Sequence, residues 1–117
     1  PPRDIPMVRA DHVFLERALT CVLMNASEAV SGQSSPAGEV RVSFWENEDC
    51  IGIVVDDNGP GFPSIDGALA LGGTTKSDGL GVGLPLVQRM LSLMNGALHL
   101  ANRSTTGASV TLTLPRA

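Results

Sequence analysis

Apolar and polar residues alternate along the chain in two rhythms, and each rhythm predicts one kind of secondary structure. From His12 to Val30, apolar residues recur at intervals of four, three, four and three, the spacing of one face of an α-helix. Leu84 to Met94 has the same character and also carries apolar residues on a second face. Residues 40–45, 50–57 and 108–114 instead alternate apolar with polar side chains, as strands with one buried face do.

Polar turns separate these segments. Residues 31–38 form a loop rich in Ser and Gly, and Glu46–Asp49 is expected to be the turn of a hairpin. A short helical turn is expected within Pro63–Ala70. The second helix should end at Asn95-Gly96 with the glycine as its C-cap. Residues 97–102 and 108–114 then form a hairpin that turns near Thr106-Gly107.

This order of elements predicts an α/β (α+β) domain. A two-layer α/β sandwich accommodates it, with a mixed, mostly antiparallel sheet and helices on one face. Val40, Val42 and Phe44 should belong to the face that the helices cover. Trp45 should lie on the open and wetter face, where an exposed apolar side chain is common.

Asp57 is the first candidate for chemistry, because it continues the apolar face of its strand. It alternates with Ile53 and Val55, so its side chain should point into the covered layer. A buried carboxylate needs a hydrogen-bond donor, and the exocyclic amine of adenine would supply one. Gly59 and Gly61 would allow a close backbone approach. An ordinary Asp-Asn-Gly hairpin turn is the alternative interpretation.

A second glycine cluster precedes the helix Leu84–Met94. Gly79, Gly81 and Gly83 leave the backbone bare where the helix begins. Free N–H groups and the helix dipole favour an anion at such a position. Lys76 is either a solvated lysine or a phosphate contact. The chain lacks the G-x-x-x-x-G-K-[ST] pattern of a P-loop and the G-x-G-x-x-G spacing of a dinucleotide site.

Composition limits the class of protein. The 117 residues form one expected domain, 1–117, with 43% hydrophobic but only 3% aromatic residues. The net charge of −4 without a basic run argues against nucleic acid as a partner. Apolar runs are too short to span a membrane. Cys21 and Cys50 lack metal spacing, which favours reduced, packed thiols and a cytoplasmic setting. The start at Pro1-Pro2 suggests a domain cut from a larger protein, whose membrane anchor would lie elsewhere.

Four segments together resemble the catalytic ATP-binding domain of a bacterial sensor histidine kinase, which has the Bergerat fold shared with gyrase, Hsp90 and mismatch-repair ATPases. The resemblance extends from about Val8 to Pro115. The segments correspond to the family's N box, first glycine box, lid end with second glycine box, and closing strand: Leu19–Ala29, Val54–Gly61, Thr74–Leu84 and Gly107–Pro115.

The resemblance implies roles for particular residues. Asn25 would be the catalytic residue that coordinates Mg²⁺ beside the triphosphate, and Asp57 would bind the adenine amine. Residues of about 62–80 would form a lid that includes Thr75 and Lys76. The residues that the resemblance assigns to ATP (or ADP) are Asn25, Asp57, Gly59, Gly61, Thr75, Lys76, Gly79, Gly81, Gly83 and Leu84.

The implied activity is transfer of the γ-phosphate of ATP to a histidine on a separate dimerisation domain, in two-component signalling to a response regulator. The fragment itself is expected to be a monomer with little turnover. Neither His12 nor His99 has the acidic residue and downstream Pro of a phosphoacceptor site. Both are expected to be structural or exposed.

Three departures from the family pattern bear on activity. Cys21 stands where relatives that hydrolyse ATP have Glu and many histidine kinases have Asn; a thiol is a poor base and a poor Mg²⁺ ligand. The lid segment Ala68–Gly73 lacks the usual Phe residues, and Ala108 replaces a common Thr. A degenerate nucleotide-binding regulatory module without phosphotransfer is therefore the main alternative. An anti-sigma-type serine kinase ranks lower, and a mismatch-repair-type ATPase lower again.

Overall fold

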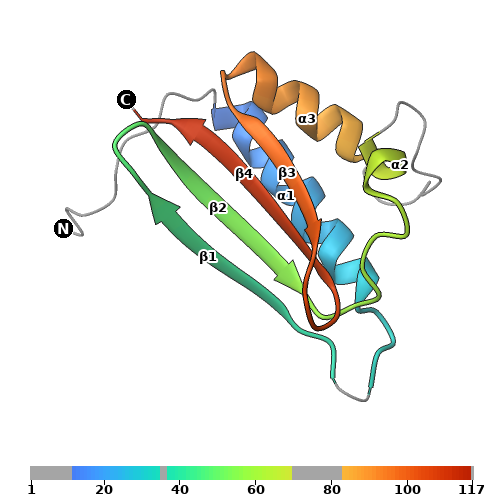
Figure 1. Ribbon diagram of the computed structural model, residues 1–117. Coiled ribbons are helices and arrows are strands. Elements are labelled where there is room, and N and C mark those ends of the chain that lie inside the picture. The colour runs from blue at the N-terminus through green and yellow to red at the C-terminus, as the bar shows by residue number, and fades with distance from the viewer. Residues whose placement is uncertain (1–11, 35–36, 70–82, 117) are drawn as a thin grey trace.

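The computed structural model describes residues 12–34, 37–69 and 83–116. Within these ranges, no helix combines the length and the apolar character needed to cross a bilayer. The elements follow the predicted order (Figure 1), with the short helix inside the expected segment. They are α1 (His12–Ala29), β1 (Val40–Glu46), β2 (Cys50–Asp57), α2 (Ile65–Leu69), α3 (Leu84–Leu93), β3 (Ala97–Asn102) and β4 (Ala108–Pro115).

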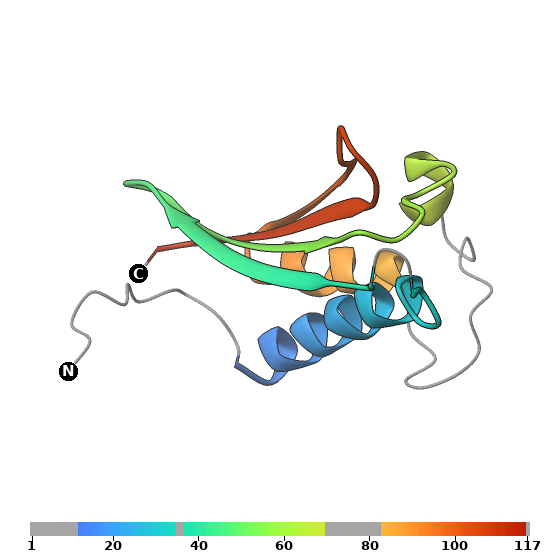
Figure 2. The ribbon, with the colours of Figure 1, turned by 90° about the horizontal axis from the view of Figure 1, so that it is seen from below.

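The strands form one four-stranded sheet in the order β1-β2-β4-β3. Every pairing between the described strands is antiparallel, so the sheet is simpler than the mixed sheet that we expected. Helices α1 and α3 lie side by side on one face of it (Figure 2). The chain therefore has the predicted α+β fold, with two layers and one open sheet face.

The core lies between the two helices and the two central strands. Its most deeply buried large side chains come from α1, α3, β2 and β4. Each buried aliphatic side chain contributes roughly 1.5–3 kcal/mol to folding. The predicted inward face of β2 is confirmed, since Val55 is 1% and Asp57 only 4% exposed. The largest fully buried side chains are Val22, Val55, Val87, Leu91, Leu112 and Leu114.

Strand β1 differs from the expectation that its apolar face would be covered. Val42 and Phe44 pair with inward-facing residues of β2 and so lie on the helix side, yet Phe44 is 69% exposed. The helices cover β2, β4 and β3 more than the edge strand β1 (Figure 1). Trp45 lies on the open face, as predicted, across from Gly52. A Cβ at Gly52 would overlap the indole ring, so the glycine makes room for the tryptophan.

The end of α3 also differs in detail from the prediction. The helix stops at Leu93, and Met94 rather than Gly96 is its C-cap. Asn95 takes the left-handed conformation with φ of 62°, which Asn tolerates better than most residues. Gly96 is needed for another reason, because a Cβ there would overlap the carbonyl oxygen of Thr113. The glycine lets the chain turn closely against β4.

Candidate functional site

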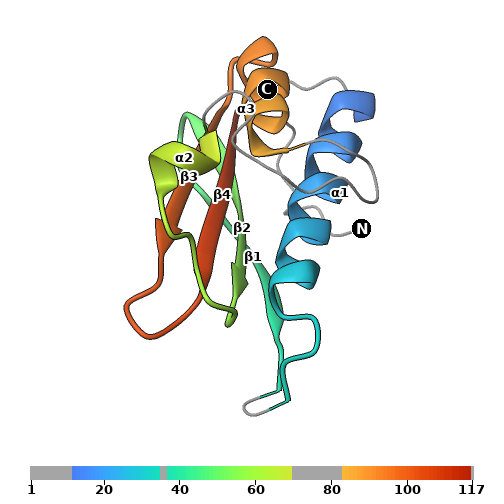
Figure 3. The same ribbon diagram turned by 90° about the vertical axis from the view of Figure 1, so that its right-hand side faces the viewer.

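The candidate site lies at the end of the sheet where β2 finishes. The C-terminal end of α1, the loop after β2, α2 and the start of α3 gather on this side of the molecule (Figure 1, Figure 3). The last residue of α1 touches the loop closely, since a Cβ at Gly59 would be 2.7 Å from the carbonyl oxygen of Ala29. Segments from distant parts of the sequence therefore surround the Asp-Asn-Gly-Pro-Gly loop.

Asp57 is a buried carboxylate with two unlike oxygens. Its Oδ1 accepts hydrogen bonds from the N–H groups of Gly59, at 2.9 Å, and Ala108, at 3.3 Å. No hydrogen bond from a described residue reaches Oδ2. The protein's own backbone thus fixes one oxygen, and the other has no donor among the described residues.

Asn58 ties the loop to the segment that precedes β1. Its Oδ1 accepts from the N–H of Glu39 at 2.8 Å, and its Nδ2 donates to the carbonyl oxygen of Ala37 at 2.9 Å. Gln33 donates from Nε2 to the carbonyl oxygen of Asn58 at 3.0 Å. Residues 31–38 were predicted only to form a loop, and no local pattern there indicates these contacts.

The β3–β4 hairpin holds the loop from the other side. Asn102 accepts from the N–H of Phe62 through Oδ1, at 2.7 Å, and donates from Nδ2 to the carbonyl oxygen of the same residue, at 3.0 Å. Arg103 donates from Nη1 to the carbonyl oxygen of Asp57 at 3.0 Å. Thr106 donates from Oγ1 to the carbonyl oxygen of Gly59 at 3.1 Å. None of these three residues is among the site residues predicted from the sequence.

Glycines permit this close packing of backbone on backbone. Gly61 has φ of +84°, and a Cβ there would be 2.8 Å from Oδ1 of Asn102. Gly107 has φ of +104°, and a Cβ there would overlap the carbonyl oxygen of Asp57. Both positions combine a left-handed conformation with a crowded neighbour, so other residues are disfavoured twice.

Asn25 lies on α1, one turn before Ala29, and so on the side of the helix that faces the loop. It is half-buried, and its side chain forms no hydrogen bond with another described residue. Cys21, one further turn back, is only 3% exposed. Burial raises the pKa of its thiol, and the nearby positive charge of Arg17 opposes this rise. Cys21 is therefore a neutral core thiol rather than a base.

The start of α3 carries an uncapped helix terminus. Gly83 is the N-cap in an extended conformation, with φ of −110° and ψ of −179°, and no side chain caps the helix. Pro85 lies in the first turn, where its missing N–H costs little. Leu84 is 5% exposed and anchors this end in the core. The expected lid is described only as far as residue 69. Its remainder, residues 70–80, lies outside the described residues, and so do four predicted site residues: Thr75, Lys76, Gly79 and Gly81.

A groove of about 790 Å³ runs along the exposed side of α3 toward the beginning of β3. Leu86 and Leu93 line it and are 42% and 66% exposed. Its β3 residues begin the strand, whereas Asn102 ends it. The groove is therefore separate from the Asp57 loop.

Comparisons with known proteins agree on one family. A family model described as "Histidine kinase-, DNA gyrase B-, and HSP90-like ATPase" matches residues 10–117. An NtrY-like sensor histidine kinase of Rickettsia conorii is 36% identical over 102 residues; the match covers 86% of this chain but only 17% of that protein.

Solved structures share the fold. The nucleotide-free catalytic domain of the histidine kinase ThkA superposes with a TM-score of 0.79 at 22% identity, covering 93% of this chain and 70% of that one. Full-length ShkA in complex with AMPPNP superposes with a TM-score of 0.75 at 26% identity, covering 97% of this chain and 24% of that one.

Proposed function

Because the chain belongs to the family of histidine kinase-, DNA gyrase B- and HSP90-like ATPases, we propose that it is the ATP-binding catalytic domain of a sensor histidine kinase. The domain would donate the γ-phosphate of ATP to a histidine on a separate phosphoacceptor domain, from which a response regulator receives it. The observation that carries the proposal is the buried Asp57, with one oxygen fixed by backbone N–H groups and one free of described partners.

Asp57 would bind the adenine base and distinguish it from guanine. Its Oδ2 would accept a hydrogen bond from the exocyclic amine, which adenine has and guanine lacks at that position. Gly59 and Gly61 would let the backbone of the loop approach the base closely. Ala108 supplies its N–H to Asp57 but has no hydroxyl for a water-mediated contact to the base.

The phosphates would bind between the ends of the two long helices. The N-terminus of α3, with Gly83 and Leu84, supports an anion through its backbone N–H groups. Asn25 fits a magnesium site, because its half-buried amide has no described partner and Mg²⁺ prefers oxygen ligands together with phosphates. Bound Mg²⁺ would neutralise phosphate charge. Thr75, Lys76, Gly79 and Gly81 would complete this side from the lid.

The geometry favours transfer to a histidine over transfer to water. An imidazole is a nucleophile by itself and needs positioning and charge neutralisation more than a general base. Cys21, with its raised pKa, stays protonated near neutral pH and cannot activate water. The separate domain would dock on the exposed apolar side of α3, where Leu86 and Leu93 are accessible. This fragment alone would be a monomer that binds ATP with little turnover.

A nucleotide-binding module without phosphotransfer is the second candidate. The buried thiol of Cys21 favours it, since a residue inside the core cannot contact the phosphates as an Asn or Glu at that position would. Both candidates require ATP binding at Asp57. They differ in whether a supplied histidine domain becomes phosphorylated.

Calorimetric titration with ATP, with and without Mg²⁺, tests the shared requirement. Asp57→Asn is a matched change, because its Oδ1 still accepts from Gly59 and Ala108 while an NH₂ replaces Oδ2 and faces the adenine amine. We expect ATP affinity to fall by about 100-fold, since a donor then opposes a donor. Asp56→Asn removes the same charge one residue away on the other side of the strand and should leave affinity within about twofold.

Two results would contradict the proposal. A folded wild-type domain that binds no ATP would remove it, and so would equal losses in the two variants, because the effect would then be general charge. If binding behaves as expected, phosphotransfer from ATP to a supplied histidine domain separates the kinase from the regulatory module.

A further inference from the structure

The five residues from Asp57 to Gly61 and the following Phe62 form a loop with one strong and one weak attachment. At its start, Asp57 still belongs to the β2 ladder. Beyond Gly59 the backbone leaves the sheet and bends through Gly61, whose φ is +84°. Among the described residues, Asn102 makes the only hydrogen bonds to the backbone of residues 60–62.

The contact has the form of a two-point pair. The side-chain amide of Asn102 accepts from the Phe62 N–H at 2.7 Å and donates to the Phe62 carbonyl at 3.0 Å. A residue of a neighbouring strand would offer the same donor and acceptor, so the side chain acts in place of a missing strand. It joins positions 40 residues apart in the sequence. The amide of Asn102 supplies both the acceptor and the donor that this pair needs.

We infer that Asn102 is a positioning residue for the adenine side of the nucleotide site. This inference rests on the proposed function. By holding Phe62, Asn102 sets the path of the glycine loop between Phe62 and Asp57, and with it the space next to the free oxygen of Asp57. It does not touch the nucleotide itself; it acts through the backbone of Gly61, against which its Oδ1 packs.

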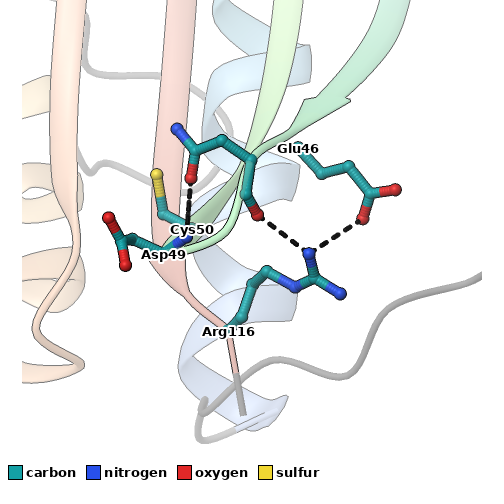
Figure 4. A network of polar contacts seen from close by, with 5 residues as sticks. Glu46, Asp49, Cys50 and Arg116 are labelled. Atoms are coloured by element: carbon teal, nitrogen blue, oxygen red, sulfur yellow. Dashed lines mark hydrogen bonds and ion pairs between the residues drawn. The ribbon is translucent and has the colours of Figure 1, made fainter.

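Three variants of the domain separate positioning from general stability. Asn102→Ala removes both hydrogen bonds. Asn102→Asp keeps the acceptor for the Phe62 N–H but places a second oxygen against the Phe62 carbonyl. Asn47→Ala is the matched control, because Asn47 also makes two hydrogen bonds, to the N–H groups of Asp49 and Cys50, each 2.8 Å long, in the β1–β2 turn (Figure 4).

We expect both Asn102 variants to bind ATP about tenfold more weakly, since each loses the equivalent of one or two hydrogen bonds of preorganisation. The preference for ATP over GTP should also shrink, because the loop beside Asp57 is displaced. Asn47→Ala should lower the melting temperature about as much as Asn102→Ala does. It should leave both ATP affinity and base preference unchanged. Wild-type affinity and base preference in Asn102→Ala would overturn the inference.

Hydrogen exchange at the Phe62 amide keeps the two proposals distinguishable. We expect this amide to exchange faster in Asn102→Ala than in the wild type or in Asn47→Ala, without any nucleotide present. A wild type that binds no ATP would overturn the proposed function, whatever the exchange shows. Unchanged exchange at Phe62 would overturn the positioning role, even in a domain that binds ATP.

Discussion

The two ends of the sheet each use an asparagine and an arginine, but these side chains have different roles at the two ends. At the β1–β2 turn, Asn47 bonds to N–H groups two and three residues ahead, and Arg116 donates to the carbonyl oxygen of Asn47 at 2.8 Å (Figure 4). At the other end, Asn102 and Arg103 bond to backbone groups 40 and 46 residues away. Asn47 closes its own turn, and Arg116 ties that turn to the residue after β4, 69 positions along the chain. Asn102 and Arg103 instead assemble a loop that the sheet cannot hold.

This difference shows how a small domain can build a site at the edge of its sheet. Ladder hydrogen bonds end where β2 ends, and the polar groups of the loop need other partners. At the candidate site those partners are side chains from a hairpin and from the segment before β1. Changes at the turn end should therefore alter stability alone, whereas changes at the site end should alter stability and nucleotide binding together.

Gly107→Ala should have the largest effect. A Cβ there would overlap the carbonyl oxygen of Asp57 in a residue with φ of +104°, and we expect a loss of about 3 kcal/mol in unfolding free energy, together with ATP binding. Gly32→Ala is the control, with φ of +79° but no atom within 4 Å. It should cost only about 1 kcal/mol. Urea unfolding measures both, and equal losses would show that backbone strain alone, rather than crowding at the site, explains Gly107.

Replacing the two arginines by methionine should have a smaller effect on stability. It should also distinguish the two ends of the sheet by their effect on ATP binding. Arg103 and Arg116 each donate one hydrogen bond to a backbone carbonyl, at 3.0 and 2.8 Å. Arg116 also pairs with the partly exposed Glu46 at 3.7 Å, and a pair of this kind adds little stability. Each substitution should therefore cost no more than about 1 kcal/mol. Only Arg103→Met should weaken ATP binding, by roughly threefold to tenfold. An equal loss of affinity in Arg116→Met would break the comparison.

The smallest effect should be seen in thiol chemistry. Cys50 is half-buried beside Asn47, and Cys21 is buried in α1. Labelling of Cys50 should be faster in Asn47→Ala and unchanged in Asn102→Ala.

Cys21 should react only on unfolding. Because burial raises its pKa in the folded state, stability should fall as pH rises above roughly 8.5, where the unfolded thiol ionises first. Cys21→Ala should flatten that decline; an unchanged slope would contradict it.

Much of the fold could be predicted because it depends on local periodicity. The alternation of Val55 and Asp57 identified the buried carboxylate, and the glycine cluster that ends at Gly83 indicated where α3 begins. The exposure of Phe44 could not be predicted, since it depends on how far the helices reach across the sheet.

The side chains that bond to the glycine loop could not be predicted from the sequence either. Asn102 stands at a strand end before a polar turn, a position where Asn is common for purely local reasons. Its contact with Phe62 exists only after the β3–β4 hairpin has docked beside the loop. Nothing in the spacing of the two residues distinguishes this Asn from one that caps its own turn, as Asn47 does.

Because Trp45 packs against Gly52, its intrinsic fluorescence reports on the β1–β2 pairing. The chain has a single tryptophan, and its indole lies on the open face of the sheet toward the turn end, 40% exposed. Its emission should shift toward the red when the β1–β2 ladder melts, yet stay constant when a nucleotide fills the site at the other end. Unfolding can thus be followed by tryptophan emission without interference from nucleotide binding.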